Sequence, residues 1–174
     1  MDKRINTLSI RGRIVYLIMC FEKYVVSQYA DRDWHDVAEM MWKICDSSDY
    51  IDNSAYHYME IVPEYLYEFN NYKDAEFDYL SEDEYKKFIS IVPADDENIE
   101  VLMHSIYSVA MEYAYTGIPT GAPDTLRYIK NVESVMKTNS IGLPDLSRID
   151  MLVDPEHWWG VPFDGRYLSI ILNQ

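Results

Sequence analysis

The 174-residue chain has few of the residues that build redox, phosphate or nucleophilic sites: it contains two cysteines and six glycines. Cys20 and Cys45 show neither CxxC spacing nor a histidine partner, and both fall on apolar faces of predicted helices. We therefore expect buried, inert thiols. The glycines are dispersed, so a glycine-rich phosphate loop is excluded. A G-x-S-x-G motif for a nucleophilic serine is also absent from the sequence.

Histidine is scarce as well, and its four copies are scattered at His35, His57, His104 and His157. They form no HxxxH or HExxH pair. Only His35 and Glu39, four residues apart on a predicted helix, could share a metal ion, and two ligands fall short of the three or four that metal sites use. The sequence predicts no catalytic residue, no cofactor and no resident metal.

Basic residues are outnumbered two to one, with 15 lysines and arginines against 30 acids and a net charge of −15. Residues 49–100 hold fifteen acids against Lys73, Lys86 and Lys87, so a net charge of −12 lies in one third of the chain. This balance argues against nucleic acid or an anionic membrane as a direct partner, because both require positive charge on the protein. A basic protein is the natural complement.

Long hydrophobic runs are missing, since the longest, Ile14–Phe21, ends after eight residues at Glu22 and Lys23. A membrane span needs about 20 apolar residues. The surrounding pattern from Ile10 to Tyr29 is apolar nearly all round, which predicts a helix buried on most of its surface. We expect it to be the central helix of a soluble protein. The N-terminus shows no cleavable signal pattern, so the expected location is cytoplasmic.

Further helices are predicted from apolar periodicity, caps and prolines. The expected segments are Trp34–Cys45 capped by Asp33, a helix from Asn53 or Ser54 to Ile61, Pro63–Phe69, a capping-box helix from Ser81 to Ile91, a helix capped by Asp95 that ends at Gly117, and Asp124–Thr138. Near the end of the chain, Asp164-Gly165 is typical of a hairpin turn, and Tyr167–Leu172 resembles a strand. The predicted fold is mainly α: a single-domain bundle of six to seven helices around a central apolar helix, with a short β element near the C-terminus.

Tyrosine is concentrated in the acidic third, where eight of the 16 tyrosines lie between Tyr50 and Tyr85. In the pairs Tyr56/Tyr58 and Tyr65/Tyr67, helical spacing predicts that one ring points inward and the other outward. Exposed tyrosine among carboxylates is typical of protein interfaces, since aromatic rings form contacts and charges steer encounter. The candidate partner-binding residues are Glu60, Glu64, Tyr65, Tyr67, Glu68, Tyr72, Asp74, Glu76, Asp78, Tyr79, Glu82 and Asp83. The alternatives are a solvated acidic face and ordinary half-buried tyrosine packing.

The chain resembles a known class of proteins in four features: the apolar first helix, the tryptophan-containing second helix, the segment Ile61-Val62-Pro63-Glu64-Tyr65-Leu66, and the ending from Phe163 to Leu172. Together these look like the small, acidic, mostly helical immunity proteins of bacterial polymorphic-toxin and contact-dependent growth inhibition systems. The resemblance implies a non-enzymatic cytoplasmic inhibitor that binds the toxic C-terminal domain of a cognate effector, often a nuclease. It supplies no site residues. The alternative function is an α-helical enzyme or small-ligand protein whose clustered carboxylates hold a divalent metal.

Overall fold

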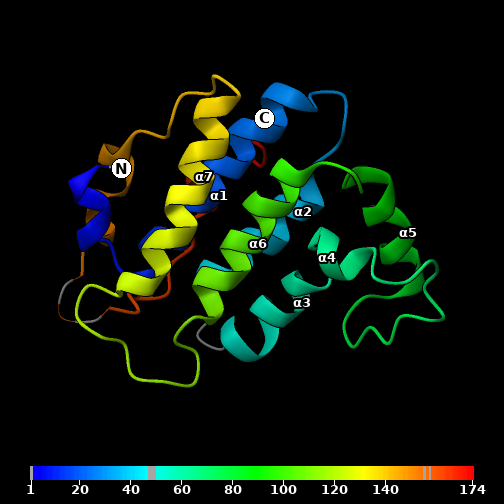
Figure 1. Cartoon of the computed structure of the whole chain (residues 1–174), viewed down its shortest axis with the longest axis horizontal. Coiled ribbons are helices and arrows are strands. Elements are labelled where there is room, and N and C mark those ends of the chain that lie inside the picture. Colours follow the sequence, from blue (N-terminus) through cyan, green and yellow to red (C-terminus); the bar gives the residue numbers. More distant parts are fainter. Residues whose placement is uncertain (1, 47–49, 155, 157) are drawn as a thin grey trace.

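The computed structural model describes residues 2–46, 50–154, 156 and 158–174 (Figure 1). The part of the chain so described contains seven α-helices, one π-helix and four short 3-10 helices. The α-helices are α1 (Ile10–Gln28), α2 (His35–Asp46), α3 (Tyr56–Met59), α4 (Pro63–Leu66), α5 (Glu82–Ile91), α6 (Glu97–Met111) and α7 (Leu126–Thr138). The π-helix is η2 (Tyr50–Ala55), and the 3-10 helices are η1 (Lys3–Thr7), η3 (Pro123–Thr125), η4 (Leu146–Leu152) and η5 (Arg166–Leu168).

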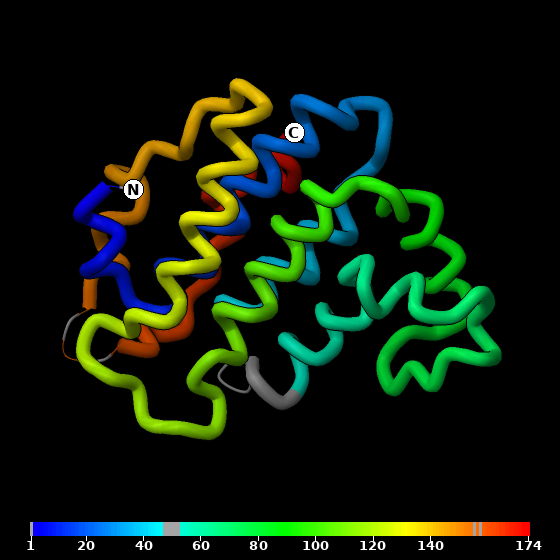
Figure 2. Tube along the Cα trace, in the orientation of Figure 1, coloured from blue at the N-terminus to red at the C-terminus, as the bar shows by residue number. Residues whose placement is uncertain are grey.

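Helix α1 is the centre of the fold, as predicted. It contacts α2, α6, α7 and η4, and in Figures 1 and 2 α6 and α7 form a layer in front of α1. Fifteen of its 19 residues are buried, including every residue from Ile10 to Glu22. Between Ile14 and Phe21 the side chains are apolar on all sides of the helix, and the charged side chains buried beside them, Arg11, Arg13 and Glu22, make hydrogen bonds. Across the described residues, none of the helices combines the length and apolarity that a membrane crossing requires.

Two arginines near the start of α1 are buried, and their guanidinium groups donate mainly to backbone carbonyls, although Arg13 Nε has no hydrogen-bond partner. Arg11 donates to the Cys45 carbonyl oxygen at 2.9 Å, next to the end of α2. Arg13 donates to the Ala122 carbonyl oxygen at 2.6 Å and to Thr125 Oγ1 at 2.5 Å. Burial lowers the pKa of Arg13 to about 10, so the side chain stays charged at neutral pH. The two arginines therefore hold the end of α2 and the segment around η3 against the first turn of α1.

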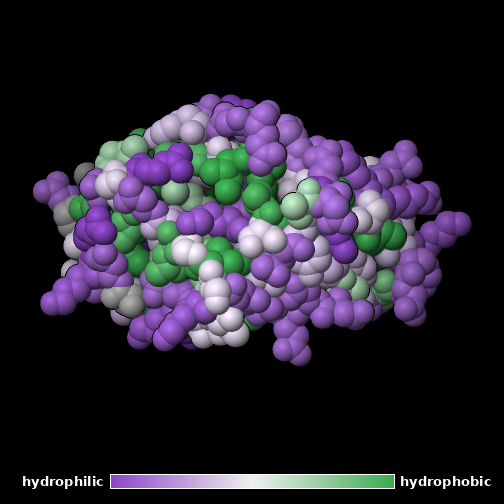
Figure 3. Space-filling model, turned by 90° about the horizontal axis from the view of Figure 1, so that it is seen from above, coloured by the Kyte–Doolittle hydropathy of each residue, from purple (hydrophilic) through white to green (hydrophobic). Residues whose placement is uncertain are grey.

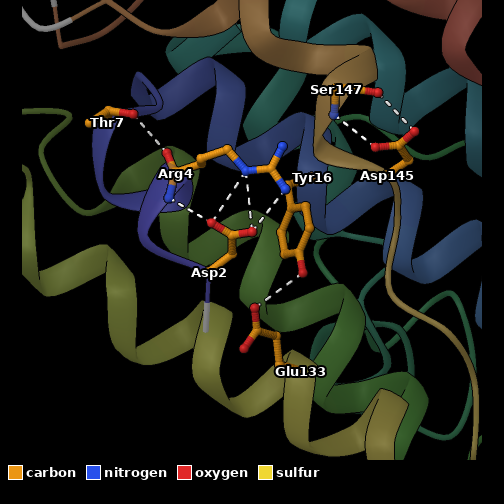
Figure 4. A network of polar contacts seen from close by, with 7 residues as sticks. All are labelled: Asp2, Arg4, Thr7, Tyr16, Glu133, Asp145 and Ser147. Atoms are coloured by element: carbon orange, nitrogen blue, oxygen red, sulfur yellow. Dashed lines mark hydrogen bonds and ion pairs between the residues drawn. The ribbon is translucent and has the colours of Figure 1, made fainter.

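Polar contacts cap the N-terminal segment and join α7 to α1 (Figure 4). The Asp2 side chain accepts a hydrogen bond from the Arg4 backbone amide at 2.9 Å and caps η1. The Tyr16 hydroxyl of α1 donates to Glu133 Oε1 of α7 at 3.2 Å, as Figure 4 shows. Burial, together with the neighbouring Glu133 carboxylate, raises the pKa of Tyr16, so the hydroxyl stays protonated and can donate.

Several helix boundaries follow the local signals in the sequence. The Asp33 side chain accepts from the His35 backbone amide at 3.0 Å at the start of α2. Pro63 begins α4, after Val62 in an extended conformation. The predicted capping box is present at α5, where Ser81 and Glu84 each accept from the other's backbone amide. Both cysteines are buried free thiols, as predicted, and burial raises the pKa of Cys45 to about 12.

Other boundaries were wrong, and tertiary contacts explain one of them clearly. Asp96, not Asp95, caps α6; its carboxylate accepts from the Asn98 amide at 2.8 Å and also from the Tyr29 hydroxyl at 2.7 Å. Helix α6 ends at Met111 instead of Gly117. The helix expected to end at Ile61 is divided into the π-helix η2 and the single turn α3, Pro63–Phe69 stops at Leu66, and α7 begins at Leu126 after the 3-10 turn η3.

The predicted β element near the C-terminus is wrong. Residues 166–168 form the 3-10 helix η5, and within the described residues the β-type pairing is an isolated bridge between Leu8 and Val153. Gly165 has φ −87°, whereas the expected hairpin turn needs positive φ at the glycine. A Cβ atom at Gly165 would lie 2.6 Å from the Trp42 ring, so close packing is what requires glycine there.

The backbone of this C-terminal segment bonds to a buried carboxylate instead of to a neighbouring strand. Glu22 of α1 accepts hydrogen bonds from Trp42 Nε1 at 2.8 Å, from Ser169 Oγ at 2.5 Å and from the Ile170 amide at 2.7 Å. Burial raises the pKa of Glu22, and these three donors act against that rise. The end of the chain is thus held on the bundle by side-chain contacts.

Candidate functional site

The acidic third of the sequence forms one end of the molecule. Most of it, namely α3, α4, α5 and the connection between α4 and α5, lies from the lower centre to the right of Figures 1 and 2, and η2 and the first turn of α6 complete it. Seen from above in Figure 3, hydrophilic residues cover most of both ends of the molecule, and hydrophobic residues show in patches, most of them nearer the middle. Because these elements lie together, the acids concentrated in residues 49–100 are also concentrated at one end of the molecule.

A hollow of about 450 Å³ lies at this end, between α3, α4 and the following connection. Six of the twelve predicted partner-binding residues line it: Glu60, Tyr65, Glu68, Asp74, Glu76 and Asp78. Its remaining lining residues are Met59, Phe69, Ala75 and Phe77. The lining thus combines carboxylates with apolar and aromatic side chains.

Glu60 lies inside the protein, contrary to its predicted place on a contact surface. Its side chain is 5% exposed and accepts hydrogen bonds from the backbone amides of Asp78 at 2.7 Å, Tyr79 at 3.1 Å and Leu80 at 2.8 Å. Three donors from one loop fill the acceptor positions of this carboxylate. Glu60 is therefore a positioning residue that holds the acidic loop.

Aromatic contacts hold the same loop from its other side. The rings of Tyr72, Phe77 and Tyr85 lie 5.6 to 5.9 Å apart between centroids. The Tyr72 hydroxyl donates to the Leu80 carbonyl oxygen at 2.8 Å. Tyr72 thus supports the loop, and the acids that the loop carries have defined positions at the hollow.

The carboxylates around the hollow are exposed and little compensated. Within the described part of the chain, Glu68, Glu76 and Asp78 have no ion pair, and Asp74 accepts from Asn71 Nδ2 at 2.5 Å. The predicted acids Glu82 and Asp83 lie outside the hollow, in the first turn of α5.

Two of the three lysines in the acidic third are already engaged. Lys86 pairs with Glu82 at 2.8 Å, and Lys87 pairs with Asp36 of α2. These two lysines are therefore not available to neutralise the other acids of this end.

The tyrosine pairs behave differently in α3 and α4. In α3 the prediction is confirmed: Tyr58 is fully buried, and Tyr56 is partly exposed. In α4 it is wrong, because both Tyr65 and Tyr67 are partly buried. The helix ends at Leu66, so helical spacing does not govern Tyr67.

Tyr65 and Tyr67 both make tertiary contacts. The Tyr67 hydroxyl donates to the Val92 carbonyl oxygen at 2.5 Å, and the Tyr65 ring meets the Tyr107 ring edge-on at 6.1 Å. Burial, with the neighbouring carboxylates of Glu64 and Glu100, raises the pKa of Tyr65, so its phenol stays a neutral donor. Tyr79 is 40% exposed and stacks on His57.

A second group of titratable side chains, Glu64, Glu100 and His104, could hold a metal ion. Their ligand atoms all lie within 4.8 Å of one another. His104 Nδ1 is 3.0 Å from Glu64 Oε2 and 3.8 Å from Glu100 Oε1, yet the geometry makes no hydrogen bond. Burial, together with the charge of Glu64, raises the pKa of Glu100. His35 and Glu39, which could share a metal ion by their spacing in the sequence, are not part of such a group among the described residues.

Sequence reasoning missed the apolar lining of the hollow and the contribution of α6 to this titratable group. Phe69 and Phe77 lie within the acidic stretch of the sequence, and their position among acids could have indicated an apolar surface there. Glu100 and His104 are four residues apart on α6, which places them on one face of that helix. Their meeting with Glu64 depends on how α4 packs against α6.

The hollow offers carboxylates, aromatic faces and a phenol, which are groups that bind cations. Comparisons of the chain with models of known protein families, with curated proteins and with solved structures find no match.

Proposed function

We propose that this chain is a non-enzymatic binding protein that neutralises a basic protein partner by covering the partner's active or substrate-binding surface with its acidic end. The observation that supports this most directly is the set of exposed acids, Glu68, Asp74, Glu76 and Asp78, that line a partly aromatic hollow. Because a buried carboxylate and an aromatic cluster hold the loop that carries three of them, little ordering is needed on binding.

The proposed partner is the toxic domain of a bacterial effector, with a nuclease as the leading candidate. A nuclease binds a polyanion and so presents a basic surface, which an acidic protein end can cover in place of the substrate. Uncompensated charge accelerates encounter, and aromatic side chains such as Tyr65 and Phe69 then give short-range contact. The resemblance to immunity proteins points the same way, and such a protein would act in the cytoplasm.

The experiment is affinity capture of the partner from the source organism, followed by two matched variants. The first carries lysine in place of Glu68 and Glu76. The control carries lysine in place of Asp31 and Asp150, which are exposed acids elsewhere in the chain, so that both variants change the net charge equally. We expect the partner to bind the wild type and the control, and the variant of the acidic end to bind at least about tenfold more weakly.

The captured partner should also be toxic when expressed alone and harmless when co-expressed with the wild-type chain. Equal binding of both variants would show that the acidic end is only a solvated surface. A partner whose expression has no effect on growth would contradict the neutralising role.

The group of Glu64, Glu100 and His104 favours a second candidate function, a protein that holds a divalent metal ion. Two carboxylates and one imidazole give a mixed oxygen and nitrogen ligand set. Zn²⁺ should then raise the unfolding midpoint of the wild type, and the increase should disappear in His104→Gln. Glu68→Gln is the control, because Glu68 lies in the hollow and outside this group. An unchanged midpoint in the wild type would reject this candidate.

A further inference from the structure

The hollow at the acidic end is lined by apolar or aromatic residues and by acids, and this combination determines which kind of ligand can bind there. Met59, Ala75 and the rings of Phe69 and Phe77 supply apolar surface, and Phe69 remains 41% exposed. A volume of about 450 Å³ falls within the range of about 300–1,000 Å³ found for small-ligand sites. An exposed aromatic surface in a hollow of this size is suited to receive a side chain from outside.

The charge of the lining restricts that side chain to a cation. Five of the ten lining residues are acids and none is basic. Glu60 is occupied by backbone amides, which leaves Glu68, Asp74, Glu76 and Asp78 as the exposed acids of the lining. An anionic ligand would be repelled there, and a neutral apolar ligand would leave the carboxylates without a counter-charge.

We propose that this hollow binds an arginine side chain presented by the partner. This inference rests on the proposed function and names the group that the acidic end recognises. The arginine stem would lie along the apolar surface, and the planar guanidinium would stack on an aromatic ring and bond to carboxylates of the lining. A lysine ammonium carries the same charge but lacks the planar, forked donor arrangement, so the hollow prefers arginine.

The hollow is formed before the side chain arrives, which strengthens the inference. The Asp78 and Leu80 amides are bound by Glu60, and Phe77 lies against Tyr72 and Tyr85. Both walls of the hollow therefore have contacts of their own within the protein. A preformed site loses less conformational freedom on binding than one that must assemble around its ligand.

The test uses three short peptides as probes, acetyl-Gly-Xaa-Gly-amide with arginine, lysine or citrulline as the central residue. Citrulline has nearly the shape of arginine but no charge. Binding to the full chain is followed by NMR of the methyl groups of Met59 and Ala75, both of which line the hollow. We expect saturable shifts at both methyl groups with the arginine peptide, several-fold weaker binding of the lysine peptide, and at least about tenfold weaker binding of the citrulline peptide.

Variants show whether the exposed acids of the lining are responsible. Replacing Glu68 and Glu76 together with glutamine should weaken binding of the arginine peptide about tenfold or more, whereas Asp31→Asn should leave it unchanged. Glutamine retains the size and polarity of both side chains, and both sites are exposed, so folding is preserved. Equal binding of the arginine and citrulline peptides, or of wild type and the double variant, would overturn the inference.

This result is separable from the proposed function. If the arginine peptide fails to bind but the captured partner still distinguishes the acidic-end variant from its control, the arginine inference falls and the proposed function stands. If the peptide binds as expected but no partner depends on the acidic end, the reverse holds.

Discussion

Removing the Glu60 carboxylate should loosen the acidic loop from the rest of the protein. The substitution Glu60→Ala leaves three backbone amides, those of Asp78, Tyr79 and Leu80, without their acceptor. Glu60 itself is 5% exposed, so the alanine also leaves unfilled space beneath the loop. The substitution tests whether this carboxylate holds the acidic loop in place.

The magnitude follows from the fate of those three donors. A hydrogen bond to a charged group contributes about 1.5–3 kcal/mol, and a buried donor left without a partner costs about 1–3 kcal/mol. Asp78 and Tyr79 are exposed, so water can reach their amides, whereas Leu80 is buried at 2% exposure. Relief of the cost of burying a carboxylate offsets part of the loss. We expect the free energy of unfolding to fall by about 2–4 kcal/mol.

Urea unfolding gives the change in stability, and amide hydrogen exchange shows where it occurs. The amide of Leu80 should exchange much faster in Glu60→Ala, while amides in α1 should lose only the protection that the global change removes. Glu68→Ala is the matched control: the same chemical change at an exposed carboxylate of the same hollow should alter stability by less than about 0.5 kcal/mol. Equal stability of Glu60→Ala and Glu68→Ala, with slow exchange retained at Leu80, would refute the role given to Glu60.

Three further predictions concern stability. Leu17→Ala in the fully buried centre of α1 should destabilise by about 2–5 kcal/mol in urea unfolding, and an unchanged midpoint would show that α1 is not central. Gly165→Ala should lower the free energy of unfolding by about 1–3 kcal/mol, because its Cβ would lie 2.6 Å from the Trp42 ring. The control Gly142→Ala, whose Cβ would meet no carbon atom within 4 Å, should lower it by less than about 0.5 kcal/mol. Equal effects of the two substitutions would contradict the packing argument. Burial lowers the pKa of His57 from its ordinary value of 6.5, so the unfolded chain takes up this proton more readily and stability should fall as the pH drops below about 6.5. Thermal unfolding between pH 7 and 5 measures this, and an unaltered slope in His57→Gln would contradict it.

The sequence by itself determined the features that depend on neighbouring residues. The segment Ile14–Phe21 is apolar on all sides, and this predicted the central helix because a helix with no polar face can only be buried. The S-x-x-E pattern at Ser81 and the proline at position 63 located two helix starts, since both act within one turn of the backbone. The concentration of acids in residues 49–100 predicted an acidic surface because charged side chains rarely leave water.

Only the tertiary structure decided which of those acids face outward. Glu60 looks like its neighbours in the sequence, yet three amides about twenty positions later in the chain stabilise it inside the protein. Gly165 has the local signature of a hairpin, but the Trp42 ring and the Glu22 carboxylate hold that segment in another conformation. These outcomes depend on contacts between residues far apart in the chain, whose free energies exceed local preferences of a few tenths of a kcal/mol to about 1 kcal/mol. Local patterns therefore predicted the helices, and long-range packing selected the residues that form the candidate site.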